Sequence, residues 1–176
     1  MNIFISGGCK NGKSYYAQEL AKQLADKSRG PLYYVATMIP HDEEDRARIR
    51  RHIEDRDGWG FETIEQGRDI KKIFDKASEH GTFLIDSVTA LLSNEMFDGG
   101  NINTDAYLKL SEDLLYIADR AANTVFVSDY IYSDAEAYEE LSECYRKGLG
   151  YADRALAKIC DRVIEVSYGQ IFDYKR

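Results

Sequence analysis

Residues 7–14 read Gly-Gly-Cys-Lys-Asn-Gly-Lys-Ser and directly follow the apolar run Ile3-Phe4-Ile5. The spacing Gly-x-x-x-x-Gly-Lys-Ser between a strand and a helix is typical of the loop that binds nucleoside triphosphates. Glycine at positions 7 and 12 allows backbone turns that a Cβ would prevent, so successive N–H groups can face phosphate oxygens. A glycine-rich turn without a ligand is the alternative. The position between a strand and a helix favours nucleotide binding, or descent from a protein that bound a nucleotide.

Each part of this loop has an expected role. Lys13 supplies a positive charge for the β- and γ-phosphates and is a predicted catalytic residue. The Ser14 hydroxyl is a predicted ligand of Mg²⁺. The helix that begins here adds the positive end of its dipole to the anion site. We expect the phosphates to contact the whole loop, namely Gly7, Gly8, Cys9, Lys10, Asn11, Gly12, Lys13 and Ser14.

Composition limits the classes of protein that are possible. The chain has 176 residues, of which 44% are hydrophobic and 31% charged, as expected for one globular domain over residues 1–176. A net charge of −8 argues against a nucleic-acid-binding surface. No segment resembles a membrane span or a signal peptide, so we expect a cytoplasmic protein. Three scattered cysteines form neither a disulfide framework nor a zinc pattern.

Short apolar runs alternate with helix-like stretches, which is typical of a parallel α/β sheet. The predicted strands are 3–6, 32–36, 83–86, 124–128 and 162–166, with 61–64 and 170–174 as candidates for additional strands. The predicted helices are 14–26, 42–55, 69–78, 89–97 and 106–121. We expect two further helices between 135 and 159, divided near Gly148 or Gly150, and a flexible stretch at 98–101.

Asp86 is the predicted second ligand of the metal ion. It ends the apolar run 83–85, and a phosphate-binding loop needs an acidic residue at the end of a nearby strand to position Mg²⁺. The alternative is that Asp86 caps the following helix, a role that Ser87 could fill equally well. Asp129, which ends the run 124–128, is a second candidate for the acidic position.

The charged segment 42–52 ends in a histidine that is surrounded by arginines. His52 lies among Arg48, Arg51 and Arg56, and such an arrangement suits phosphate oxygens. Helical spacing places Arg48 and His52 on the same face. A histidine in this setting can act as an acid, a base or a phosphate-accepting nucleophile. The alternative is a surface histidine on a solvated helix face.

Tyrosine is frequent, with 13 residues, and most of these side chains are expected to pack in the interior. Tyr130, Tyr132 and Tyr138 follow a predicted strand end. They are the tyrosines for which a role in lining a pocket stays open.

Together these motifs resemble the family of bifunctional adenosylcobinamide kinases / adenosylcobinamide-phosphate guanylyltransferases of cobalamin assembly. The resemblance begins with the strand and loop at 5–14 and with Tyr-Val-Ala-Thr at 34–37. Further matching motifs are Asp42-x-Glu44, Arg48-Ile49-x-x-His52, the spaced Trp59, Thr63 and Glu65, Ile85-Asp86-Ser87-x-Thr89, and Ser93-Asn94. The resemblance covers the whole chain and is specific over roughly the first 97 residues.

The resemblance implies a RecA-like P-loop fold, a three-layer α/β sandwich whose mostly parallel sheet has an antiparallel edge. It implies that the loop and Mg²⁺ transfer a γ-phosphoryl group from ATP or GTP to adenosylcobinamide. It implies that His52 then attacks the α-phosphate of GTP and carries GMP to the phosphorylated product. Thr37, Arg48, Arg51 and Glu65 complete the expected nucleotide-binding set, and a homotrimer is the expected assembly.

The chain departs from the family pattern at a few positions. Asp45, Ile53 and the pair Arg56-Asp57 differ, residues 128–132 read Ser-Asp-Tyr-Ile-Tyr in place of Ser-Asn-Glu-Val-Gly, and Asp153 takes the place of an asparagine. These changes remove groups expected near the ligand. Two alternatives therefore stay open: a P-loop kinase for another small alcohol, and a nucleotide-binding regulator without catalysis.

Overall fold

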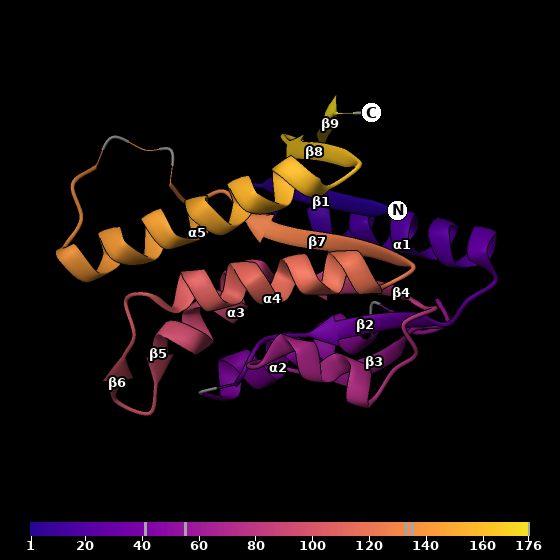
Figure 1. Ribbon diagram of the computed structural model, residues 1–176, viewed down its shortest axis with the longest axis horizontal. Helices are drawn as coiled ribbons and strands as arrows, with labels where there is room; N and C mark the ends of the chain where they lie inside the picture. The colour runs from indigo at the N-terminus through magenta and orange to yellow at the C-terminus, as the bar shows by residue number, and fades with distance from the viewer. Residues whose placement is uncertain (41, 55, 133, 135, 176) are drawn as a thin grey trace.

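The computed structural model describes residues 1–40, 42–54, 56–132, 134 and 136–175, with only the backbone at residues 48 and 52. Its main strands are β1 (Asn2–Gly7), β2 (Leu32–Ala36), β3 (Glu62–Glu65), β4 (Thr82–Asp86), β7 (Asn123–Asp129), β8 (Arg162–Ser167) and β9 (Gln170–Lys175). They form one sheet in the order β3-β2-β4-β7-β1-β8-β9 (Figure 1). All neighbours pair in parallel except β8 and β9, which are antiparallel. The predicted antiparallel edge is confirmed.

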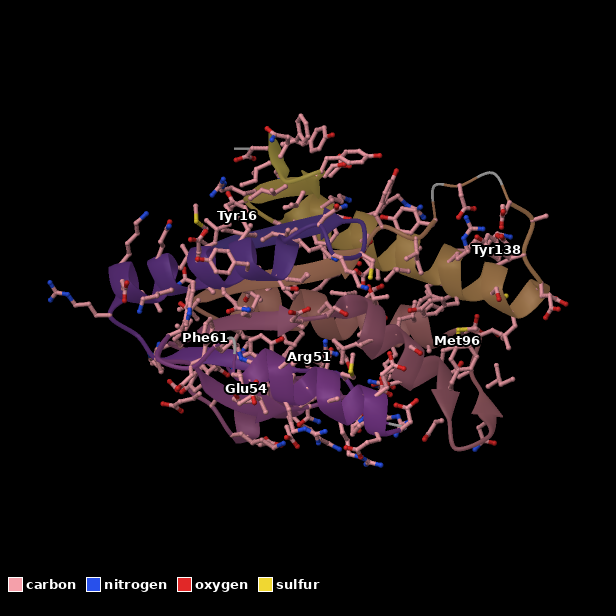
Figure 2. The ribbon with its side chains drawn as sticks, turned by 180° about the vertical axis from the view of Figure 1, so that it is seen from behind. Tyr16, Arg51, Glu54, Phe61, Met96 and Tyr138 are labelled. Atoms are coloured by element: carbon pink, nitrogen blue, oxygen red, sulfur yellow. The ribbon has the colours of Figure 1, made fainter. Side chains whose placement is uncertain are left out.

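Helices cover both faces of this sheet. They are α1 (Lys13–Ser28), α2 (Glu43–Glu54), α3 (Val88–Met96), α4 (Ala106–Arg120), α5 (Glu140–Ile159) and the 3₁₀ helix η1 (Ile70–Asp75). Helices α3, α4 and α5 lie on the face toward the viewer in Figure 1, and α1 and α2 lie on the side seen in Figure 2. The result is the predicted three-layer sandwich. Among the described helices, none combines the length and apolar character needed to cross a membrane.

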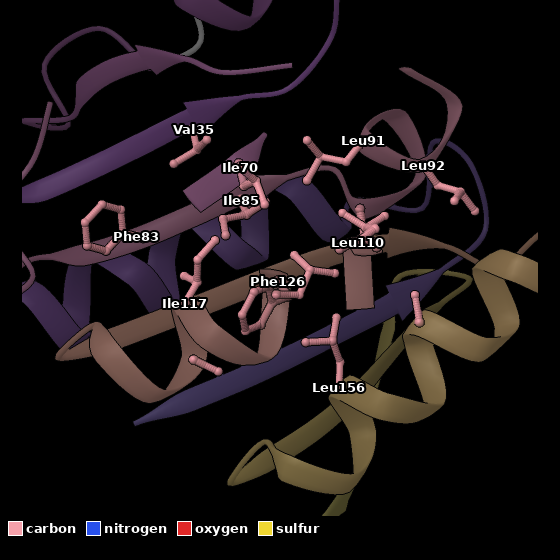
Figure 3. Packing of buried hydrophobic residues seen from close by; sticks show 14 of the residues in the cluster. Val35, Ile70, Phe83, Ile85, Leu91, Leu92, Leu110, Ile117, Phe126 and Leu156 are labelled. Atoms are coloured by element: carbon pink, nitrogen blue, oxygen red, sulfur yellow. The ribbon is translucent and has the colours of Figure 1, made fainter. Parts of the chain in front are cut away.

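Two apolar clusters hold the layers together. The larger one lies between the sheet and α3, α4 and α5, and includes Phe83, Phe126, Leu110 and Leu156 (Figure 3). The smaller one joins the opposite sheet face to α1 through residues such as Ile5 and Leu20. Because the central strands are buried on both faces, their sequences are continuous apolar runs and not alternating ones.

Two expectations about helices are wrong. The stretch 69–78 contains only η1, in which the buried Ile70 and Ile73 lie three residues apart, the repeat of a 3₁₀ turn. Residues 140–159 form the single helix α5, which continues through Gly148 and Gly150. A Cβ at Gly148 would lie 3.0 Å from the Cβ of Tyr107 on α4. The close approach of α4 explains the glycine, and helix packing outweighs its low helix propensity.

The structure places a turn at residues 98–101, the stretch that is expected from sequence to be flexible. This stretch connects β5 (Phe97–Asp98) to β6 (Asn101–Ile102), an antiparallel pair that follows α3. Gly99 and Gly100 both have positive φ angles, 56° and 95°. Such angles favour glycine, and they make this segment a β-hairpin.

The sheet topology determines which loops meet. The carboxyl ends of β1, β4 and β7 lie at one edge of the sheet, where parallel α/β folds bind ligands. This edge gathers the loop 7–14, Asp86 and Asp129. Strand β7 pairs directly with β1, whereas β4 lies one strand further away.

Candidate functional site

The loop between β1 and α1 has a shape that requires glycine at two positions. Gly12 has a φ of 84° immediately before α1. A Cβ at Gly7 would overlap the carbonyl oxygen of Val166 on β8. The first N–H groups of α1 have no acceptor within the helix, so the loop offers hydrogen-bond donors to an anion. This geometry agrees with the predicted phosphate-binding role of residues 7–14.

Lys13 is held inside the loop by an ion pair. Its side chain is only 8% exposed, and Nζ lies 2.6 Å from Oδ1 of Asp129 and donates to the carbonyl oxygen of Gly8 at 3.1 Å. Asp129 ends β7 directly opposite Gly7, and its own N–H donates to Oγ1 of Thr89 at 2.8 Å. Asp129, the second candidate from sequence, is therefore the acidic residue beside Lys13.

Asp86 lies at the end of β4 with its carboxylate available for a ligand. Ser87 caps α3, because its Oγ accepts from the N–H of Ala90 at 3.2 Å. Ser87, and not Asp86, is therefore the residue that caps the helix. The carboxylate of Asp86 instead accepts a hydrogen bond from the hydroxyl of Tyr34 at 3.0 Å. Ser14 and Asp86 are both partly exposed and offer hydroxyl and carboxylate oxygens. Such hard oxygen donors suit Mg²⁺, which protein sites bind through one or two carboxylates together with phosphates and water.

The hydroxyl of Tyr34 supports the carboxylate of Asp86, and an arginine covers the Tyr34 ring. The guanidinium carbon of Arg56 lies 3.5 Å from the centre of the Tyr34 ring, and Arg56 is buried. Burial raises the pKa of Tyr34, and the negative charge of Asp86 raises it further, while Arg56 opposes the rise. Tyr34 therefore stays a neutral donor that orients Asp86. The sequence indicates Arg56 only as one of the arginines near His52, and its contact with Tyr34 is visible only in the structure.

Replacing Tyr34 by phenylalanine should weaken the binding of magnesium nucleotide by about tenfold, because an outer-shell hydrogen bond orients the metal ligand. Nucleotide titrations with and without Mg²⁺ measure the effect, which should vanish without the metal. Tyr33→Phe is the matched control, since its hydroxyl accepts from Ser78 on the other face of the sheet. Equal metal dependence in the two variants would contradict this role.

Three predicted nucleotide-binding residues either lie on other elements than the loop or are buried in hydrogen bonds to the protein. Thr37 is completely buried, and its Oγ1 accepts from the N–H of Ser87 at 2.6 Å. Glu65 is exposed at the end of β3, four strand spacings from β1, or roughly 19 Å. Arg51 is exposed on α2, where Nε donates to the carbonyl of Ala47 at 3.4 Å (Figure 2). Their roles in nucleotide binding stay predictions.

The side chains of His52 and Arg48 lie outside the part of the chain that the structure describes, although both backbones belong to α2. The backbone of His52 is four residues before Arg56, which stacks on Tyr34. Through Arg56, the end of α2 therefore connects to Tyr34 and Asp86. The catalytic role of His52 stays a prediction.

A buried carboxyl group lies close behind the loop. Asp153 on α5 is 2% exposed, and its Oδ2 accepts from Ser128 at 3.0 Å and from Tyr132 at 2.9 Å. Its Oδ1 is buried without a hydrogen-bond partner among the described residues. Burial raises the pKa of Asp153 to about 7; the two hydrogen bonds oppose this rise and the charge of Asp129 adds to it. Tyr132 and Asp153, two of the positions that depart from the family pattern, thus contact each other.

The free energy of unfolding of Asp153→Asn should exceed that of wild type by more at pH 8 than at pH 4.5. The native carboxyl keeps its proton up to about pH 7, whereas an unfolded one releases it near pH 4, so wild-type stability falls between these values. Asparagine cannot ionise and avoids this loss, on the order of 2–4 kcal/mol. Urea unfolding at both pH values measures the difference. A difference between the variants that does not change with pH would contradict the argument.

The three tyrosines that follow β7 divide into a packed pair and a single residue. Tyr130 and Tyr132 pack edge to face with ring centres 5.0 Å apart. Tyr138 lines a cavity near the start of α5, so the pocket-lining role suggested from sequence is confirmed for this residue.

Solved structures with the same fold support the architecture. The ATPase domain of G40P superposes with a TM-score of 0.56 at 12% identity, over 93% of this chain and 68% of that chain. A KaiC-like protein, PH0186 from the archaeon Pyrococcus horikoshii OT3, gives 0.52 at 15% identity, over 94% of this chain and 70% of its own. The chain therefore has the predicted α/β RecA-like fold.

Sequence comparison identifies the family. The Escherichia coli (strain K12) bifunctional adenosylcobalamin biosynthesis protein CobU is 30% identical over 110 residues. That match spans 61% of this chain and 57% of the relative. The model of the CobU family, described as cobinamide kinase / cobinamide phosphate guanyltransferase, matches residues 3–173. This chain therefore belongs to the cobinamide kinase / cobinamide phosphate guanyltransferase family.

Proposed function

We propose that this protein is a bifunctional transferase of cobalamin biosynthesis. It phosphorylates adenosylcobinamide with ATP or GTP and then transfers GMP from GTP to the product through His52. The observation that carries the proposal is the buried Lys13, held by Asp129 inside a phosphate-binding loop of a chain that matches this family over 3–173. By the same resemblance we propose a homotrimer, which light scattering tests.

In the kinase step, the triphosphate replaces Asp129 as the ion-pair partner of Lys13. The lysine exchanges the carboxylate of Asp129 for oxygens of the β- and γ-phosphates, while the loop N–H groups bind the same phosphates. Ser14 and Asp86 would hold Mg²⁺, which supplies further positive charge when bound. The acceptor hydroxyl attacks the γ-phosphorus and the bond to the β-phosphate oxygen breaks. Asp129, released from Lys13, is placed beside the loop to accept the hydroxyl proton.

In the guanylyl step, a ring nitrogen of His52 attacks the α-phosphorus of GTP. A P–N bond forms and pyrophosphate leaves. A phosphate oxygen of adenosylcobinamide phosphate then attacks the same phosphorus, and the imidazole leaves. Imidazole suits this task because it is nucleophilic near neutral pH and leaves well once protonated.

The covalent step can be tested by measuring the intact mass of the protein after incubation with GTP. We expect a gain of one GMP, removed again when adenosylcobinamide phosphate is added. An unchanged mass, in a preparation that phosphorylates adenosylcobinamide, would reject the guanylyl half of the proposal. Nucleotide binding without turnover of any acceptor would favour the regulator alternative.

A further inference from the structure

A cavity of about 360 Å³ opens at the start of α5. Its lining is mainly aromatic and aliphatic, and includes Phe97, Ile131, Tyr138, Leu141, Tyr145 and Arg146. Figure 2 shows Tyr138 and Met96, the neighbour of Phe97, at the same end of the molecule. The cavity therefore lies between the end of α3, the segment after β7 and the first turns of α5. Among the described residues, none proposed to act in the kinase or guanylyl step lines it.

A chain of contacts links this cavity to the phosphate-binding loop. The hydroxyl of Tyr145 donates to the carbonyl oxygen of Thr89 at 2.9 Å, and Oγ1 of Thr89 accepts from the N–H of Asp129. Asp129 in turn forms the ion pair with Lys13. Burial raises the pKa of Tyr145, and the negative charge of Asp129 raises it further. The inner wall of the cavity thus adjoins the place where a γ-phosphate would meet an acceptor.

Residues 134–146, which border the cavity and which we call its acidic rim, carry a surplus of negative charge. Five acidic residues and one arginine fall between positions 134 and 146. Arg146 already pairs with Asp134 at 2.9 Å and with Glu143 at 2.6 Å, and it stacks on the Tyr138 ring at 4.3 Å. The surplus of negative charge favours a cationic ligand over another phosphate-bearing molecule.

We propose that this cavity is the acceptor site of the kinase reaction. It holds an apolar edge of the cobinamide macrocycle, so that the hydroxyl-bearing arm reaches toward Lys13 and Asp129. The cavity volume is at the lower end for small-molecule sites, so the rest of the macrocycle lies outside, with its cationic cobalt centre over the acidic rim. This inference rests on the proposed function, since it names where that function takes its acceptor.

The test is to fill the cavity from its open side. Ser142 lines the cavity and is exposed, so Ser142→Trp places an indole there without disturbing the apolar core. We expect the KM for adenosylcobinamide to rise by about tenfold or more, the equivalent of about 1.4 kcal/mol of binding, with the KM for ATP unchanged. Ser142→Ala should behave as wild type. Lys147→Trp, exposed on the same helix and absent from the lining, is the size-matched control.

The outcomes separate this inference from the function on which it rests. Phosphorylation of adenosylcobinamide by wild type, together with an unchanged acceptor KM in Ser142→Trp, overturns the acceptor site and leaves the kinase function standing. Equal KM increases in Ser142→Trp and Lys147→Trp overturn it as well. If wild type fails to phosphorylate adenosylcobinamide while it binds ATP, the proposed function is rejected and the inference with it.

Discussion

Replacing His52 by alanine should stop the reaction at cobinamide phosphate. Without the imidazole no covalent GMP carrier can form, so we expect GDP-cobinamide formation to fall by about 10⁴- to 10⁶-fold, the range seen when a catalytic nucleophile is removed. Phosphorylation of adenosylcobinamide should continue, because it depends on the loop at residues 7–14. Chromatography of the products formed from GTP and adenosylcobinamide measures both steps in one reaction.

His80→Ala is the matched control for this variant. His80 is exposed just before β4, at the amino ends of the parallel strands and so away from the phosphate-binding loop. We expect it to form both products at wild-type rates. GDP-cobinamide formation by His52→Ala at the rate of the control would reject His52 as the GMP carrier, whatever happens to the kinase step.

Replacing Lys13 by methionine should lower the rate of phosphorylation by about 10²- to 10³-fold, as the loss of a preorganised charge at the transition state does. Methionine has a similar length, so it fills the buried space without the charge. The carboxylate of Asp129 is 25% exposed and can be hydrated by water, so the fold should survive the loss of the ion pair. Initial rates with saturating ATP measure the effect.

Lys27→Met provides the control for this substitution. Lys27 is exposed in the last turn of α1, at the opposite end of the helix from the loop. The Lys27→Met protein should phosphorylate adenosylcobinamide at the wild-type rate. Circular dichroism should show wild type, Lys13→Met and Lys27→Met equally folded. Wild-type kinase activity in a folded Lys13→Met protein would place the reaction elsewhere in the molecule.

The loop at residues 7–14 could be predicted from sequence because its chemistry depends on neighbouring residues. Gly7, Gly12 and Lys13 shape a single turn, and their spacing alone indicates what that turn binds. The same kind of local pattern could not decide whether Asp86 or Asp129 lies beside Lys13. The choice of Asp129 depends on strand order, since β7 lies between β4 and β1. Strand order follows from packing across the whole sheet and not from any local pattern.

The wrong helix predictions have a similar cause. Two glycines favoured a break near 148–150, yet the contact between Gly148 and Tyr107 of α4 supports an uninterrupted helix. Asp153 was visible in the sequence as a departure from the family pattern. Its burial and its bonds to Ser128 and Tyr132 could be known only once α5 was placed against β7.

The stoichiometry of a reaction with GTP as the only nucleotide tests the two-step mechanism. Wild-type protein, adenosylcobinamide and Mg²⁺ are combined with GTP, and all products are quantified. The mechanism predicts one GDP and one pyrophosphate for each GDP-cobinamide, because one GTP donates its γ-phosphoryl group and another donates GMP. Release of GDP and inorganic phosphate with adenosylcobinamide left unchanged would contradict it.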